Sequence, residues 1–487
     1  MKLSLATLPE LPAGVAGPAY TREALSPGIL HFGVGNFHRA HMAVYLDRLF
    51  NTGRDHDWAI VGGGVTGYDA RMRDALEPQD WLTTVVEMAP ERSAARVTGA
   101  MIGFVPPMDA PAIIAQLADP AIRIVSLTVT EGGYFIDPAT GEFNPDDPAI
   151  RADAANPDEP RTVFGLILAG LRARRAAGTQ PFTVLSCDNV PHNGVVTRNS
   201  VAGLAEAADP DLANWLRGEV AFPNGMVDRI ATATGDRERD LCREEFGIDD
   251  AWPVFCEDYA QWVVEDRFPA GRPALEEAGV TFTADVTPFE TMKIRILNGG
   301  HATIAYPAGL MDIHFAHEAM ADPLVGGFLA AVEREEILSV VPPVPGVVLD
   351  EYFDLIVRRF ANPKIADTVR RLAFDGSNRQ PKFIVSTVAD RLARGAPIDG
   401  LALVSALWCR YCAGTTESGA EIAPNDPDWE RLTATAQAAR SDPAAWLEMR
   451  HIYGAVADAS AFRDAFCAYL ASIWQEGTEA VLRRYVA

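Results

Sequence analysis

The sequence is poor in basic residues and has no cluster of them. Its 487 residues include 42 lysines and arginines against 66 aspartates and glutamates, which gives a formal net charge of −24 at pH 7. Proteins that bind nucleic acid normally present a basic stripe to the phosphates. We therefore expect no nucleic-acid partner and no anionic membrane surface, and the acidic balance favours solubility instead.

Cysteines and long apolar runs are also scarce. Six cysteines are scattered along the chain, too sparsely for a disulfide framework in a protein of this length. No stretch approaches the ~20 uninterrupted apolar residues of a transmembrane helix. Pro9 and Pro12 interrupt the short apolar N-terminus, which argues against a secretory signal. The sequence therefore predicts a cytoplasmic protein.

The length exceeds the usual size of one hydrophobic core, so we expect two large domains. In the first, short apolar runs alternate with helical patterns, and several of the runs end in glycine. The expected strands are residues 28–35, 58–64, 122–130 and 182–189, and the clearest helices are residues 38–50 and 162–178. Strands interleaved with helices predict an α/β domain with a parallel, doubly wound, Rossmann-type sheet over residues 1–285.

After about residue 285 the pattern changes to helical periodicity with few β-branched runs. The segments FETMKIRILNGG, HATIAYPAGLMD, LVGGFLAAVEREEILS and LALVSALWCRYCAG all read as helices. We therefore expect a mainly α-helical C-terminal domain over residues 286–487.

The first expected strand runs directly into Gly33 and Gly35, and a helix follows. This is the placement of a dinucleotide-binding turn, in which glycines permit a tight bend and a close approach of the pyrophosphate. The third position of the fingerprint is His38 rather than glycine, and glycines after a strand also form simple turns. Both interpretations stay open on the pattern alone.

Asp69 is the first acidic residue after the second expected strand. A carboxylate there accepts hydrogen bonds from the adenosine ribose of NAD and repels the 2′-phosphate of NADP. Asp69 is equally suited to cap the helix that follows, and Arg71 and Arg73 keep NADP open as an alternative. We expect NAD.

The densest group of chemically useful residues is Lys293, Asn298 and His301 in KIRILNGGH. Their side chains can converge on one side if the helix ends near Gly299–Gly300. The competing interpretation is a solvated lysine, an asparagine at a helix end and a packing histidine. A second polar cluster, residues 186–194, lies where an expected strand ends, and ligands bind beyond such carboxyl ends.

Six motifs together resemble the polyol-specific long-chain dehydrogenase/reductase family, and within it the mannitol 2-dehydrogenase type. They are GVGNFHRAH, LTVTEGGYFID, SCDNVPHNG, FPNGMVDRI, DDAWPVFCEDYAQWVVEDRF and KIRILNGGH, in this order over essentially the whole chain. The resemblance implies a Rossmann-type domain packed against a helical domain that completes the substrate site. It also implies an NAD-dependent enzyme without metal that interconverts a polyol such as mannitol with its ketose, acting as a monomer.

Carried over by motif, the resemblance makes Lys293 the general base. Asn189 and Asn298 would hold the reacting oxygen, and His301 would fix the substrate and the lysine. These residue types suit the reaction, because a lysine lowered from its usual pKa of ~10.4 can accept the hydroxyl proton. Two amides can donate hydrogen bonds to the alkoxide without supplying a proton.

The same motifs assign the remaining contacts. The cofactor would lie against Gly33, Gly35, Asn36, Phe37 and Asp69.

Asp228, Arg371 and Arg379 would bind substrate hydroxyls, although surface ion pairs explain the arginines equally well. Glu290, three residues before Lys293, can interact with that lysine on one helical face.

Other chemistries fit less well. No tyrosine has a lysine four positions later, as short-chain dehydrogenases require. His314 and His317 lack further metal ligands, and Cys409 and Cys412 lie in a helical pattern that favours packing. Two rival functions stay open: a hexuronate reductase acting on fructuronate or tagaturonate, with arginines binding the carboxylate, and a non-catalytic NAD-binding regulator.

Overall fold

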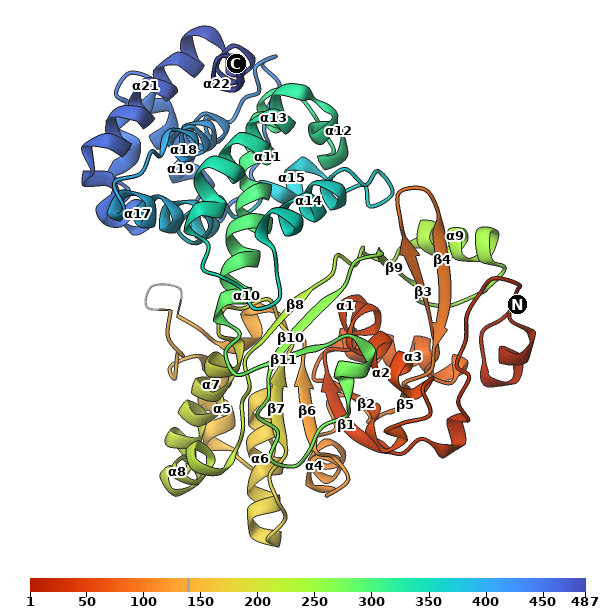
Figure 1. Ribbon diagram of the computed structural model, residues 1–487. Helices are drawn as coiled ribbons and strands as arrows, with labels where there is room; N and C mark the ends of the chain where they lie inside the picture. The colour runs from red at the N-terminus through yellow and green to blue at the C-terminus, as the bar shows by residue number, and fades with distance from the viewer. Residues whose placement is uncertain (138–140) are drawn as a thin grey trace. The chain divides into compact units, whose positions relative to one another are not determined.

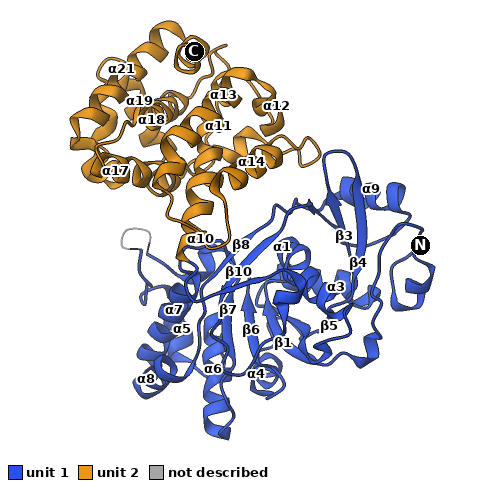
Figure 2. Cartoon of the chain, in the orientation of Figure 1, with its two compact units in different colours: residues 1–286 blue, residues 287–487 orange. Residues whose placement is uncertain are grey.

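The computed structural model describes residues 1–137 and 141–487, which form two compact units, Met1–Val286 and Thr287–Ala487 (Figures 1 and 2). The first unit is built on a parallel sheet and the second is mainly helical. This confirms the predicted fold class. Within the described residues, no helix is long and apolar enough to cross a membrane.

The core of the first unit is a five-stranded parallel sheet in the order β5-β2-β1-β6-β7. Its strands are β1 (Pro27–Phe32), β2 (Ala59–Gly63), β5 (Met101–Phe104), β6 (Ile124–Leu127) and β7 (Thr183–Ser186). Four of them were expected from apolar runs, and the structure confirms these. The order changes direction next to β1, and an open parallel sheet offers its binding crevice at such a point.

Helices cover both faces of this sheet (Figure 1). Successive strand residues alternate between two apolar clusters, so that Ile29 packs with one cluster and Leu30 with the other. The helices of this unit are α1 (Asn36–Ala40), α2 (Met42–Phe50), α3 (Gly67–Leu76), α4 (Ala110–Ala118), α5 (Pro148–Ala155), α6 (Val163–Ala177), α7 (Asn193–Ala208), α8 (Pro210–Glu219) and α9 (Asp236–Phe246). Its short 3-10 helices are Leu5–Glu10, Arg22–Ala24, His56–Trp58, Glu77–Gln79, Glu131–Tyr134 and Leu275–Ala278.

Two small sheets were not predicted. One has the order β4-β3-β9 and the other β11-β10-β8, and each combines one parallel with one antiparallel pair. Their strands are β3 (Thr83–Met88), β4 (Ser93–Thr98), β8 (Gly225–Asp228), β9 (Val254–Glu257), β10 (Gln261–Glu265) and β11 (Thr281–Thr283). Most have only three to five residues, too few for a clear period in the sequence.

One helix was expected over residues 38–50, and the structure has two. The helix is interrupted at His41, whose backbone (φ −118°, ψ −89°) is not helical. The His41 ring is buried and its Nε2 lies 3.0 Å from the carbonyl oxygen of Gln261. A contact with a residue 220 positions away thus accompanies the break, and local periodicity cannot reveal it.

The second unit consists of helices. They are α10 (Thr287–Met292), α11 (Gly299–Leu310), α12 (Ala316–Ala321), α13 (Pro323–Ala331), α14 (Leu349–Phe360), α15 (Val369–Leu372), α16 (Gly376–Gln380), α17 (Ser386–Ala393), α18 (Asp399–Cys412), α19 (Trp429–Ala439), α20 (Arg450–Tyr453), α21 (Ser460–Glu476) and α22 (Thr478–Val486). Three π-helical segments join some of them: η7 (Lys293–Asn298), η8 (Val332–Ile337) and η10 (Pro381–Val385). Short 3-10 helices occupy Leu338–Val340, Pro443–Glu448 and Gly454–Asp458.

The helix does not end near Gly299–Gly300, which was the condition considered for the side chains of Lys293, Asn298 and His301 to converge. The chain passes from α10 through η7 into α11 without a break, and both glycines are buried inside the helical run. A Cβ on Gly300 would lie 3.2 Å from Oε1 of Glu333 and 3.3 Å from the Phe360 ring. Gly300 therefore lets neighbouring helices approach closely and does not stop the helix.

Glu333 is an acidic residue buried in the core of the second unit. Its side chain is fully buried, and neither carboxylate oxygen has a hydrogen-bond partner among the residues that the structure describes. Burial raises the pKa of Glu333 well above its usual value. The folded protein therefore holds Glu333 in its neutral form over a wide range of pH.

This burial predicts how stability depends on pH. A carboxyl whose pKa is raised in the folded state binds its proton more tightly there, so stability falls as pH rises from the unfolded pKa towards the folded one. Replacing Glu333 with methionine removes the carboxyl and with it this dependence of stability on pH. We expect Glu333→Met to raise the free energy of unfolding by about 1 to 3 kcal/mol at pH 8 and by less at pH 4.

Urea denaturation at the two pH values measures this difference. Glu335→Met is the matched control, because Glu335 is exposed on the same π-helical segment. A Glu333→Met protein that is less stable than wild type at pH 8 contradicts the assignment of an unpaired carboxyl.

Candidate active site

The turn after β1 is fixed by a close backbone approach. Gly33 has a φ of +90°, and a Cβ there would lie 2.0 Å from the carbonyl oxygen of Thr128, directly after β6. The Thr128 hydroxyl donates to the Gly33 carbonyl at 2.6 Å. Gly35 precedes α1, and the nearest atom to a Cβ there is 3.9 Å away. The first glycine is sterically required, whereas a Cβ at the second would have no close contact.

His38 occupies the position of the third fingerprint glycine. Its ring stacks on His31 of β1, with ring centroids 3.5 Å apart and an angle of 16° between the planes. Burial lowers the pKa of His31 to about 3 and the pKa of His38 well below 6.5. Two neutral stacked rings therefore join the helix to the strand, where the usual fingerprint has direct backbone packing.

Asn36 and Phe37 are the other residues expected to meet a cofactor. The Asn36 amide donates to Thr232 O at 2.7 Å and to Thr234 Oγ1 at 2.9 Å, and its oxygen accepts from Arg39 at 2.9 Å. The Phe37 ring stacks against His41. Both side chains thus take part in internal packing, and the backbone of this turn is the part best suited to bind a ligand.

Asp69 and Gly64 form one structural unit at the end of β2. Asp69 Oδ2 accepts from the backbone of Val65 (3.0 Å) and from the backbone (2.9 Å) and hydroxyl (2.6 Å) of Thr66, which caps α3. A Cβ on Gly64 would overlap the Asp69 side chain at 2.2 Å. Thr66 is thus the N-cap, and Asp69, considered in the sequence as the cap itself, is the third residue of α3 and completes the capping box. In the described part of the chain, no hydrogen bond reaches Asp69 Oδ1.

The two arginines beside Asp69 differ in their surroundings. Arg73 pairs with Glu77 at 2.8 Å, one helical turn away. Arg71 is exposed, and its guanidinium lies 5.9 Å from the centre of the Tyr68 ring. Of the two, Arg71 is the cation that stays beside the N-terminal turn of α3.

Asn193, within the polar cluster expected at residues 186–194, fixes the loop that carries Asn189. Its Nδ2 donates to the carbonyls of Ser186 (3.3 Å), Asp188 (3.1 Å) and Gly225 (2.8 Å), and its Oδ1 accepts from Gly225 N at 2.9 Å. It is completely buried, whereas Asn189 is exposed. Asn193 thus joins the end of β7 to the start of β8.

Asp188 ties the same loop to the turn after β6. Its carboxylate accepts from the backbone of Val129 and Thr130, both at 2.9 Å, and from the Tyr134 hydroxyl at 2.7 Å. Thr130 has a φ of +66° and a ψ of +165°, a conformation that residues other than glycine rarely adopt. Local backbone strain of this kind concentrates at functional sites. In the sequence, these residues could have been found from their positions directly after neighbouring strands.

Asp228 is the last residue of β8, and its Cα pairs with that of Gln261 on β10. It is 5 % exposed. A buried carboxylate at a strand end is suited to accept hydrogen bonds from a polar ligand.

Lys293 and Asn298 are the first and last residues of η7, and His301 lies in the first turn of α11. Residues five apart on an α-helix lie about 140° apart around its axis, whereas a π-helix bonds residues five apart. The π-helical segment therefore brings Lys293 and Asn298 to one side. Lys293 is 7 % exposed, and the His301 ring stacks on Phe360 with centroids 4.3 Å apart.

The amide of Asn298 has an unusual environment. Its Oδ1 is buried and has no hydrogen-bond partner within residues 1–137 and 141–487. Leaving a buried polar atom unpaired costs about 1 to 3 kcal/mol, and such atoms in native structures need an explanation, of which ligand binding is one.

The two arginines expected at the substrate have partners within the second unit. Arg371 forms a two-pronged ion pair with Asp367, one turn earlier. Arg379 donates to the Leu372 carbonyl at 3.4 Å and lies over the Phe374 ring at 5.8 Å. The surface ion pair that was considered for these arginines is thus present at Arg371.

Other candidate groups have ordinary environments. No group of three or more histidines, cysteines or acids that could hold a metal occurs among the described residues. Cys409 and Cys412 are fully buried, and burial raises the pKa of both thiols well above the usual value. Because the thiolate is the reactive form, these cysteines have a packing role.

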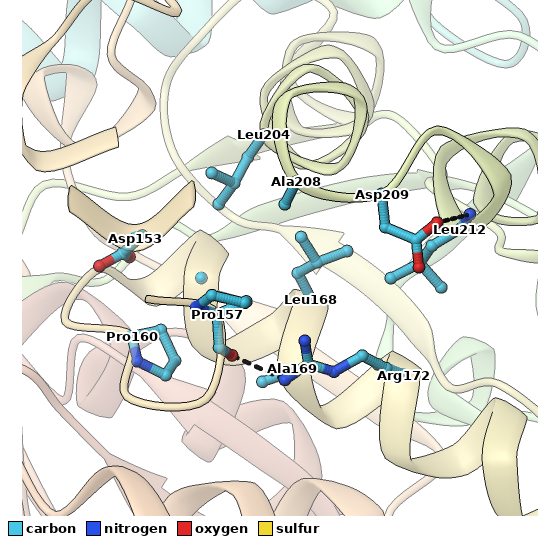
Figure 3. A pocket seen from close by; sticks show the side chains of 11 residues that line it. Asp153, Pro157, Pro160, Leu168, Ala169, Arg172, Leu204, Ala208, Asp209 and Leu212 are labelled. Atoms are coloured by element: carbon cyan, nitrogen blue, oxygen red, sulfur yellow. Dashed lines mark hydrogen bonds between the residues drawn. The ribbon is translucent and has the colours of Figure 1, made fainter. Parts of the chain in front are cut away.

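A small hollow lies away from these residues, among α5, α6, α7 and α8 (Figure 3). Its polar groups are already bonded: Arg172 donates to the Pro157 carbonyl at 2.7 Å, and Asp209 accepts from Leu212 N at 3.1 Å. The hollow therefore offers no unpaired group for catalysis.

Two family models match the chain. The description "Mannitol dehydrogenase Rossmann domain" matches residues 27–277, and "Mannitol dehydrogenase C-terminal domain" matches residues 285–474. Among curated relatives, a mannitol 2-dehydrogenase of Cereibacter sphaeroides is 59% identical over 97% of this chain and 99% of its own length. One of Aspergillus fumigatus is 40% identical over 90% of this chain and 88% of its own.

Solved structures agree in fold. Pseudomonas fluorescens mannitol 2-dehydrogenase, in a ternary complex with NAD and D-mannitol, superposes with a TM-score of 0.88 at 42% identity, covering 100% of this chain and 99% of that one. A substrate-free D-sorbitol dehydrogenase superposes with a TM-score of 0.91 at 36% identity, covering 99% and 100%.

The parallel sheet, its glycine turn and the helical second unit define a Rossmann-type protein with an added α-helical domain. Within that class, the chain belongs to the mannitol dehydrogenase family. This confirms the resemblance drawn from the six sequence motifs.

The hydrogen bonds of Asn193 give a testable consequence for stability. Asn193→Ala leaves buried backbone groups at Ser186, Asp188 and Gly225 without a partner, so we expect a loss of about 2 to 3 kcal/mol in the free energy of unfolding. Urea denaturation followed by circular dichroism measures it. Asn199→Ala, at an exposed position of the same helix, is the matched control. Equal stability of the two variants would contradict the role of Asn193.

Proposed function

We propose that the protein is an NAD-dependent polyol dehydrogenase that oxidises D-mannitol to fructose and catalyses the reverse reduction. The observation that carries this proposal is the full-length similarity to the mannitol 2-dehydrogenase solved with NAD and D-mannitol, together with the 59% identity to a second enzyme of that name. We further propose that residues 1–285 bind the dinucleotide and that residues 286–487 supply the base and substrate contacts.

The residues of the first unit suit NAD. A Cβ on Gly35 would have no contact closer than 3.9 Å, and α1 begins beside it, so a pyrophosphate can approach this turn closely. Asp69 Oδ1 is a carboxylate oxygen without a hydrogen bond from the described residues, as an acceptor for ribose hydroxyls must be. Asn36 and Phe37 would contribute through their backbone. NAD, when bound, accepts a hydride from the carbon that is oxidised.

In the proposed mechanism, Lys293 accepts the proton of the hydroxyl group on the carbon to be oxidised. Lys293 is 7 % exposed, so its amine lies inside the protein and not on a solvated surface. Asn189 and Asn298 hold the same oxygen through their amides as negative charge develops. The Nδ2 of Asn298 would donate to the alkoxide, and its unpaired Oδ1 would accept from another donor of the ligand.

His301 would orient the substrate and Lys293, with its ring held against Phe360. Asp228 would accept hydrogen bonds from further hydroxyl groups, and we propose the same kind of contact for Arg371 and Arg379 once their present partners are exchanged. Glu290, buried on the turn before Lys293, is suited to interact with that lysine. We also propose that the enzyme acts as a monomer in the cytoplasm.

A hexuronate reductase is the nearest rival, because its substrate carries a carboxylate that arginines would bind. The pairing of Arg371 with Asp367 opposes either kind of new partner, and the polyol is favoured by the names of the similar full-length enzymes. A non-catalytic NAD-binding regulator has no need for a buried lysine on a π-helical segment.

A panel assay separates these functions. Reduced-nicotinamide absorbance is followed with D-mannitol, D-arabinitol and D-sorbitol in the presence of NAD or NADP, and with fructose and fructuronate in the reverse direction. We expect the highest kcat/KM for D-mannitol with NAD, unchanged by prolonged chelation. Faster reduction of fructuronate than of fructose would favour the hexuronate reductase, and no turnover of any substrate would favour the regulator.

The role of Lys293 has its own test. Lys293→Ala should lower kcat by at least ~10²-fold, the usual contribution of a general base, while the Kd for NADH stays within about twofold. Arg334→Ala is the control, because it removes an exposed cation from a neighbouring π-helical segment. Near-normal turnover by a folded Lys293→Ala protein would remove this residue from the mechanism.

The preference for NAD over NADP tests whether Asp69 binds the adenosine ribose. Asparagine retains the oxygen that caps α3 but carries no charge to repel a 2′-phosphate. We expect Asp69→Asn to raise kcat/KM for NADP relative to NAD by about tenfold or more, whereas Asp74→Asn, exposed on the same helix, leaves the ratio unchanged. An unaltered ratio in Asp69→Asn would make Asp69 a helix cap only.

A further inference from the structure

Arg229 lies where the chain passes from one small sheet to the other. β8 ends at Asp228, which pairs with Gln261 of β10. Directly after Arg229 the chain joins β9: the amide of Glu257 donates to the Ile230 carbonyl at 3.0 Å, and the amide of Ile230 donates to Glu257 Oε1 at 2.6 Å. Asp228 is therefore the last residue of one sheet, and Arg229 begins the connection to the next.

The guanidinium of Arg229 is bonded to three elements. Its Nη1 donates to the carbonyl of Ala40 at the end of α1, and its Nη2 donates to Glu87 Oε1 on β3, both at 2.7 Å. Nε and Nη2 also donate to the carbonyl of Glu257 on β9, at 3.1 and 2.8 Å. The side chain is only 1 % exposed. Because hydrogen bonds shielded from water are stronger than those at the surface, this network holds Arg229 in one position.

Anchoring Arg229 also anchors the residue before it. A single planar peptide bond joins Asp228 to Arg229, so a shift of Arg229 carries the backbone of Asp228 with it. A carboxylate that accepts hydrogen bonds from a ligand depends on its exact place, and a misplacement of about 1 Å can cost ~10²-fold in activity.

We propose that Arg229 is a positioning residue, whose anchors on α1, β3 and β9 set the place of the Asp228 carboxylate and with it the affinity for a polyol. This inference rests on the proposed function and deepens it, because that function assigns Asp228 to substrate hydroxyl groups. Arg229 acts through Asp228 and makes no substrate contact of its own. Lysine cannot take its place, since one ammonium group lacks the fork of donors that reaches several acceptors at once.

A double-mutant cycle tests whether Arg229 acts through Asp228. The kcat and KM for D-mannitol at saturating NAD are measured for Arg229→Ala, Asp228→Ala and the double variant. We expect each single substitution to lower kcat/KM by about 10- to 100-fold, mainly through KM. In the Asp228→Ala background, Arg229→Ala should cost less than about threefold more, because the carboxylate that it positions is already absent.

Three further measurements separate positioning from a general loss of structure. The Kd for NADH should stay within about threefold in every variant, since the glycine turn has its own anchor at Thr128. Arg229→Lys should raise KM in the same way while its circular dichroism matches wild type, and it replaces Arg229→Ala in the cycle if the alanine variant does not fold. Arg48→Ala is the matched control: Arg48 also donates to Glu87 Oε1, at 3.1 Å, but from α2 and with 36 % of its side chain exposed. Its kcat/KM should stay within about twofold of wild type.

The outcomes distinguish this inference from the function on which it rests. Losses that add in the cycle overturn the positioning role, because Arg229 would then act independently of Asp228. A rise in the Kd for NADH that parallels the rise in KM also overturns it, since the substitution would then loosen the whole unit. An Asp228→Ala protein with the wild-type KM overturns the inference together with the substrate contact of Asp228. A wild-type protein that oxidises no polyol overturns the proposed function itself.

Discussion

The approach of the first strand to its neighbour at Gly33 and Thr128 is the constraint on which the first unit depends. The carbonyl of Thr128 occupies the space of any Cβ at position 33, so only glycine can make this turn. The hydroxyl of Thr128 and the buried ring of His31 lie beside the Gly33 carbonyl. The turn is therefore held by residues from two strands, and α1 begins from a fixed point.

Further contacts of the same kind organise the carboxyl edge of the sheet. Asp188 joins the turn after β6 to the loop after β7, and Asn193 joins that loop to β8. Asp69 closes the turn after β2 on itself. In each case a buried amide or carboxylate satisfies backbone groups that would otherwise lack partners. The buried polar residues of this edge thus stabilise the loops that present the candidate site, whereas Asn189 on one of these loops is exposed.

Much of this was predictable because it depends on neighbours in the sequence. Apolar runs ending in glycine located four of the five main strands, and Thr162 and Gly178 mark the ends of α6 as the pattern indicated. The motif order identified the family. The small mixed sheets, the break at His41 and the continuation of the helix through Gly299 were not predictable, because each depends on packing between distant segments.

The sequence by itself determined the fold class, the family and the chemical types at the candidate site, since these follow from local periodicity and from motifs of adjacent residues. Only the tertiary structure decided how those residues are presented. It placed Lys293 and Asn298 on one side through a π-helical segment that packs against two others, and it assigned Asp69 to a cap and Asn193 to a buried junction. Helical register and hydrogen-bond partners depend on contacts across tens to hundreds of residues, and no local pattern records them.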